Sequence, residues 1–156
     1  MNPFFIKKGF TLVEISLVIA LFLIVLSFAV PYGLRFFKVE RLDGISRDLL
    51  ETLRLTQSQA ASQNLDSNYG VSINSNAFIS FKGNSYTSRS VAYDQEFAIP
   101  NGIEVSGLPE VIFYKLTGLP NQSGEIRLSS GARINVITIN SQGTMSLELS
   151  ASLGNP

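Results

Sequence analysis

An apolar run near the N-terminus constrains this chain more than any other feature. Residues 10–30 (FTLVEISLVIALFLIVLSFAV) carry a single charge, on Glu14. A helix of that length rises roughly 30 Å, enough to cross the hydrocarbon core of a bilayer. Lys7 and Lys8 precede it, and the positive-inside bias predicts that they stay in the cytoplasm. We therefore predict a transmembrane helix over residues 10–30. It is kept as an anchor, because the run is longer than the apolar region of a cleavable secretory signal.

The composition removes several classes of chemistry. The chain has 156 residues with no Cys and no His, so disulfides, thiolate catalysis and Ser-His catalytic units are absent. Lys plus Arg and Asp plus Glu both number 12, and this zero net charge disfavours binding to the phosphate backbone of nucleic acids. No nucleotide-binding or hydrolase motif occurs. We predict that the protein is not an enzyme and needs neither a cofactor nor a metal.

Glu14 does not fit a plain anchor. A carboxylate one turn inside an apolar helix costs very roughly 2–3 kcal/mol unless it is paired. If the chain were cut before Phe10, the new α-amino group would lie near this carboxylate. Ammonium and carboxylate could then pair between neighbouring molecules in a bundle.

The run KKGFTLVE, residues 7–14, resembles the leader of type IV prepilins and type II secretion pseudopilins. The shared features are basic residues, Gly before the cut, Phe after it, and Glu at the fifth mature position. The resemblance implies that a prepilin peptidase cuts between Gly9 and Phe10 and N-methylates Phe10. The amine stays cationic, so it can still pair with Glu14 of a neighbour. Pro31 matches a helix proline of many family members, where we expect a kink. An unprocessed anchor is the alternative.

Beyond the apolar run, charged and apolar residues are mixed. Leu42, Ile45, Leu49 and Leu53 recur at spacings of three and four, which places them on one face of a helix. We predict an amphipathic stem helix over residues 31–64. Its apolar stripe should dock onto the protein's own C-terminal domain.

From residue 69 the apolar period changes to two, which is typical of β-strands. Asn74-Ser75-Asn76 predicts a hairpin turn, and residues 83–90 predict a polar loop. Strands are predicted at residues 69–73, 78–81, 95–99, 102–106, 111–114, 125–128, 133–140 and 144–149. We therefore predict a β-rich periplasmic head over residues 65–156, built as an antiparallel sandwich or sheet.

The C-terminal part is similar to the H-type minor pseudopilins. An aromatic strand over 112–114, Gly118, an I-x-L strand over 126–128 and a last hairpin around Gly143 carry the similarity. It implies an α+β fold in which a long N-terminal transmembrane/stem α-helix packs on a C-terminal antiparallel β-sandwich. The missing C-terminal disulfide loop fits a pseudopilin better than an adhesive pilus subunit.

These resemblances imply a minor pseudopilin near the tip of a type II secretion pseudopilus, supporting export of folded proteins across the outer membrane. The expected partners are other minor pseudopilins, the major pseudopilin, the prepilin peptidase, the inner-membrane assembly platform and the membrane itself, but not nucleic acid. The expected location is the bacterial inner membrane, with the N-terminus cytoplasmic and the head periplasmic. Alternatives are a minor pilin of a type IV pilus or DNA-uptake filament, and a ligand-binding or enzymatic head on an unprocessed anchor.

The segment around residues 83–94 contains two further groups. Asp94 and Glu96 share a face of a predicted strand, but a calcium site wants more oxygen ligands. Tyr86, Arg89 and Tyr93 are candidates for a small recognition patch.

Overall fold

The computed structural model describes residues 11–149, with side chains for 11–27 and 40–149. The chain divides into two compact units, Met1–Phe37 and Lys38–Pro156. Helix α1 (Leu12–Ala61) contributes residues to both units. The predicted leader, residues 1–9, lies outside the described residues, as does Phe10.

The predicted transmembrane helix is not found. Across the side chains that the structure describes, no helix has the length and apolar character required to cross a membrane. Such a helix needs about 20 consecutive, mostly apolar residues. The predictions of a transmembrane helix over residues 10–30 and of a single-pass inner-membrane location are therefore wrong. The fold-class prediction is wrong with them, because it requires a transmembrane helix and the described residues contain none that could cross a membrane.

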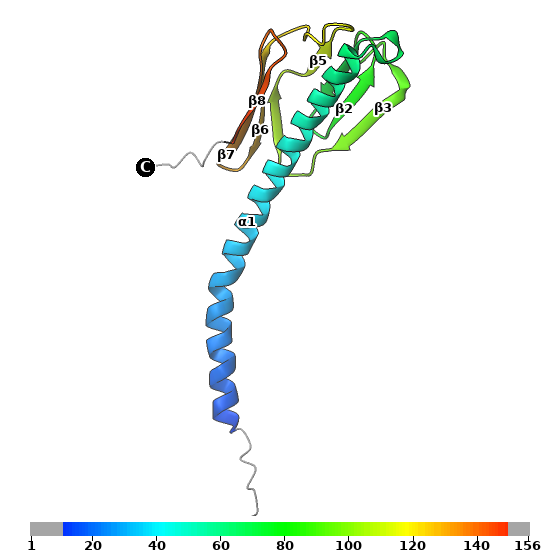
Figure 1. Cartoon of the computed structure of the whole chain (residues 1–156). Helices are drawn as coiled ribbons and strands as arrows, with labels where there is room; N and C mark the ends of the chain where they lie inside the picture. Colours follow the sequence, from blue (N-terminus) through cyan, green and yellow to red (C-terminus); the bar gives the residue numbers. More distant parts are fainter. Residues whose placement is uncertain (1–10, 150–156) are drawn as a thin grey trace, which may run out of the picture. The chain divides into compact units, whose positions relative to one another are not determined.

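The C-terminal unit holds two four-stranded antiparallel sheets beside the α1 residues that belong to it (Figure 1). The first sheet has the order β3-β2-β1-β5, and the second has the order β4-β6-β7-β8. The elements that follow α1 are η1 (Asn64–Asp66), β1 (Tyr69–Ile73), β2 (Ala77–Lys82), β3 (Ser90–Ala98), β4 (Glu104–Gly107), β5 (Glu110–Phe113), β6 (Gly124–Ser130), β7 (Arg133–Ile139) and β8 (Met145–Leu149).

Helix α1 covers both sheets through the predicted apolar stripe. Leu42, Leu49 and Leu53 are fully buried, and Ile45 packs against the same core. The prediction that this stripe docks onto the protein's own domain is confirmed. From the sheets, the core takes alternate side chains of β1, β5, β6 and β7, as expected for strands with one buried face. Its fully buried members include Val71, Phe78, Val111, Phe113, Ile126, Leu128 and Ile137.

Asparagine side chains build two of the predicted turns. In the β1–β2 turn, Asn74 Oδ1 accepts hydrogen bonds from the backbone N–H groups of Asn76 and Ala77, at 2.9 and 2.8 Å. Asn140 does the same in the β7–β8 turn, where Thr144 N–H donates to its Oδ1 at 2.8 Å. These side chains replace backbone partners, which is why Asn favours turns. Both hairpins are confirmed.

Two boundaries differ from the prediction by three residues or more, whereas the others lie within two residues of it. The helix ends at Ala61 rather than near residue 64, and the chain then enters left-handed backbone at Gln63, Leu65 and Asp66, with φ of 55°, 52° and 50°. Strand β3 begins at Ser90, not at residue 95. Most of its residues are exposed, so its first half has no buried face to impose an apolar alternation on the sequence.

Candidate functional site

The described side chains of the N-terminal unit form a helix that is apolar on all sides. Their large apolar members are between 42% and 85% exposed, from Leu26 to Leu12. A helix that is hydrophobic all round is normally buried. Exposed apolar patches of this kind mark interaction surfaces. The set, which we call the apolar helix surface, is Leu12, Val13, Ile15, Leu17, Val18, Ile19, Leu21, Phe22, Leu23, Ile24, Val25 and Leu26.

Glu14 lies at the start of this surface, with its side chain exposed. Its backbone N–H donates to Thr11 Oγ1 at 3.2 Å. Thr11 is therefore the N-cap of α1, and Glu14 stands three residues later, as in the T-x-x-E capping box. A carboxylate in the first helical turn also interacts favourably with the positive end of the helix dipole. The sequence reasoning overlooked this local role, although the spacing of Thr and Glu signals it.

The other predicted processing residues are not brought into the described site. Lys7, Lys8, Gly9 and Phe10 lie outside the described residues. Pro31 lies within α1, and the predicted kink there stays a prediction.

The segment before β3 is held by a compact cluster around Arg89. Its Nε donates to Asp94 Oδ2 at 2.7 Å and its Nη1 donates to the carbonyl of Tyr86 at 2.7 Å. The guanidinium also lies 3.7 Å from the centroid of the Tyr86 ring. The hydrogen bond that Arg89 donates to Asp94 raises the pKa of Arg89. The contacts of Arg89 within the cluster indicate a structural role for it, although Asp94 Oδ1 is buried and has no hydrogen-bond partner among the described residues.

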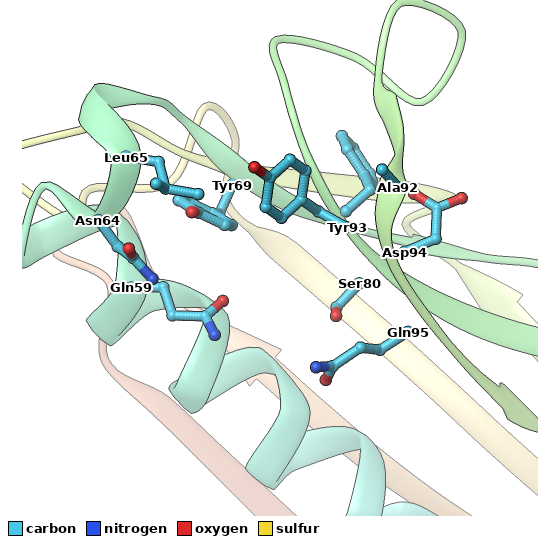
Figure 2. Close-up of a pocket in the computed structure, with 10 residues that line it drawn as sticks. Gln59, Asn64, Leu65, Tyr69, Ser80, Ala92, Tyr93, Asp94 and Gln95 are labelled. Carbon is cyan, nitrogen blue, oxygen red and sulfur yellow. The ribbon is translucent and has the colours of Figure 1, made fainter.

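The predicted recognition patch is therefore split. Tyr86 and Arg89 stack on each other, whereas Tyr93 projects from the side of β3 opposite Asp94 (Figure 2). Adjacent residues of a strand point to opposite faces, which explains the separation. Among the residues that the structure describes, no cluster of three or more potential metal-ligating side chains includes Asp94 or Glu96.

A cavity of about 290 Å³ opens on the Tyr93 side of β3. Its walls come from the last turns of α1, from η1 and from the first three strands (Figure 2). The pairing register between β2 and β3 shifts between Ser80 and Lys82, beside the cavity. Such bulges re-aim side chains and are enriched next to functional sites. The polar residues that line it are Gln59, Asn64, Tyr69, Ser80, Tyr93, Asp94 and Gln95.

Sequence reasoning missed this cavity. Its residues are spread from the end of α1 to β3, and neither a motif nor a periodic pattern links them. Only the pairing of β1, β2 and β3 brings them together.

No protein-family model, no characterised protein and no solved structure matches the chain.

Proposed function

We propose that the chain is a minor pseudopilin that assembles near the tip of a type II secretion pseudopilus and supports export of folded proteins across the outer membrane. The observation that carries this proposal is the apolar helix surface, together with the exposed carboxylate of Glu14 at its start. Such a surface is costly to leave in water, at roughly 25 cal/mol per Å² of apolar area. Packing against the same helix of neighbouring subunits removes that cost and produces a filament core.

Glu14 gives the assembly its register. In the proposed mechanism, the prepilin peptidase removes residues 1–9 and methylates the new Phe10 amine, which remains a cation. An ammonium group of an adjacent subunit then pairs with Glu14. An uncompensated carboxylate among packed apolar helices is strongly unfavourable, so subunits that fail to align this pair are disfavoured. Other minor pseudopilins and the major pseudopilin supply the neighbouring helices.

A clean deletion in the native host tests the function. We expect exported enzymes to disappear from the medium while surface pili and DNA uptake stay normal. Normal export with lost pili or lost DNA uptake would transfer the protein to a pilus machinery. Normal export, piliation and uptake together would contradict the proposal altogether.

Two substitutions separate the assembly role of Glu14 from its capping role. Glu14→Gln keeps a side chain that suits a capping box but removes the charge, whereas Thr11→Ala removes the cap and keeps the charge. We expect Glu14→Gln to be processed normally, as judged by intact mass, and to be lost from sheared filaments. Thr11→Ala should still co-purify with the filaments. The reverse pattern would assign Glu14 to helix capping alone.

A further inference from the structure

The cavity between α1, η1 and β3 contains an unsatisfied hydroxyl group. Tyr69 is only 6% exposed, and among the described residues its hydroxyl has no hydrogen-bond partner. A buried hydroxyl without a partner is energetically unfavourable, and most such groups in proteins are satisfied. Burial raises the pKa of Tyr69, and the neighbouring Tyr93 adds to the effect, so the hydroxyl keeps its proton at neutral pH. The cavity therefore offers a hydrogen bond that the protein itself does not use.

The neighbouring polar groups face the same space. Figure 2 shows Gln59 and Gln95 pointing toward one another from α1 and β3, with Ser80 near Gln95. The hydroxyls of Tyr69 and Tyr93 both point toward the side where Asn64 and Leu65 lie. Amides and hydroxyls can each donate and accept hydrogen bonds. The ligand must therefore carry several groups that both donate and accept.

Among the described residues that line the cavity, Asp94 alone carries a charge. Its Oδ2 accepts a hydrogen bond from Arg89 Nε at 2.7 Å, and Figure 2 shows its carboxylate turned away from Tyr93. Lys82 places its ammonium group 4.8 Å from the centroid of the Tyr93 ring and holds that ring by a cation–π contact. The other six polar lining residues are uncharged, and Arg89 compensates the charge of Asp94, so the lining favours neither an anion nor a cation.

We propose that this cavity binds one ring of a neutral saccharide. Sugar hydroxyls donate and accept hydrogen bonds, as the amides and hydroxyls of the cavity require. The C–H face of a sugar ring suits an aromatic side chain, and Tyr93 is 47% exposed beside the cavity. A volume of about 290 Å³ is at the small end of ligand sites, which fits a single ring better than an extended peptide. This inference does not depend on the proposed secretion role.

Saturation-transfer NMR on the full chain in non-ionic detergent tests the proposal. The probes are glucose, galactose, mannose and N-acetylglucosamine, with the neutral peptide N-acetyl-Gly-Ser-Gly-amide as the competing class. We expect saturable binding of at least one sugar. Tyr69→Phe should weaken that binding about tenfold, the effect of losing one hydrogen bond.

Two further variants complete the design. Gln95→Ala changes an exposed residue of the cavity and should also weaken binding of the sugar. This variant keeps the test valid even if Tyr69→Phe disturbs the fold. Tyr114→Phe removes a hydroxyl from an exposed tyrosine outside the cavity lining and should leave affinity unchanged. Absence of saturable sugar binding, sugar binding that is indifferent to both cavity variants, or binding of the peptide alone would overturn the proposal.

Discussion

Replacing Asn135 should destabilise the C-terminal unit more than any other change to a single polar side chain on β7. Asn135 is 1% exposed and projects from β7 onto α1. Its Nδ2 donates to Asp43 Oδ1 at 2.9 Å and to Ser46 Oγ at 3.0 Å. Ser46 is itself fully buried, and its hydroxyl donates a hydrogen bond to the carbonyl oxygen of Leu42 at 2.8 Å. The amide thus joins a sheet to a helix about 90 residues away in sequence.

The magnitude follows from these two bonds. A hydrogen bond to a charged group contributes about 1.5–3 kcal/mol and a neutral one about 0.5–1.5 kcal/mol. Asp43 is only partly buried, so water can hydrogen-bond its carboxylate when the Asn135 amide is removed and thereby offsets part of the lost stability. Ser46 keeps the bond that it donates to Leu42. Asn135→Ala should therefore lower the free energy of unfolding by about 2–3 kcal/mol.

Urea denaturation of the full chain in non-ionic detergent, followed by tyrosine near-UV circular dichroism, measures this change. With a slope of about 1–3 kcal/mol per molar urea, the midpoint should fall by about 0.7–3 M. Asn135→Asp is the informative control, because it sets a second carboxylate against Asp43. That variant should be less stable than Asn135→Ala at neutral pH and should recover as the pH falls and one carboxylate is protonated. A loss below about 0.5 kcal/mol for Asn135→Ala would refute the reasoning.

Three further changes test other contacts. Gly107→Ala should lower the free energy of unfolding by more than about 3 kcal/mol, because a Cβ there would clash with the Glu125 carbonyl oxygen. Gly102→Ala has open space around it and should lose only the roughly 1–2 kcal/mol of left-handed backbone; equal losses in urea denaturation would exclude the steric explanation. Gln57→Leu removes two hydrogen bonds of 3.0 Å from its Nε2 to loop carbonyls and should cost about 2 kcal/mol in the same assay; an unchanged midpoint would contradict this. Burial raises the pKa of Tyr69 above 10.0, so the folded state retains the proton that the unfolded state releases. The free energy of unfolding should therefore fall as the pH rises through and beyond 10. Tyr69→Phe should lose less stability over this pH range, and identical pH profiles for the two proteins would rule out this linkage.

Local signals in the sequence were sufficient for most of the C-terminal unit. The Leu42, Leu49 and Leu53 stripe could be recognised because a helix repeats every 3.6 residues, and all three side chains are buried. The turn at Asn74 could be recognised because its side chain bonds to amides two and three residues ahead. Strand β3 was mostly missed, because an exposed edge strand has no buried face to set its pattern.

The apolar run is where sequence reasoning failed. Its composition led to a transmembrane helix and an inner-membrane location, and the described residues contain no helix fit for either. The same reasoning treated Glu14 only as an assembly residue. The hydrogen bond that its backbone N–H donates to Thr11 Oγ1 shows that Thr11 caps the helix and that Glu14 lies in its first turn.

By itself, the sequence determined the helical stripe, the turns and most strands, because these depend on neighbours within a few residues along the chain. Only the tertiary structure decided the order of strands in the two sheets, and with it the contacts made by isolated polar side chains. Asn135 meets Asp43, and Tyr69 and Tyr93 line the same cavity, through pairings that no local pattern encodes. The reason is physical: periodicity reports which face of an element is buried, whereas the partner of a buried polar group depends on register between distant elements.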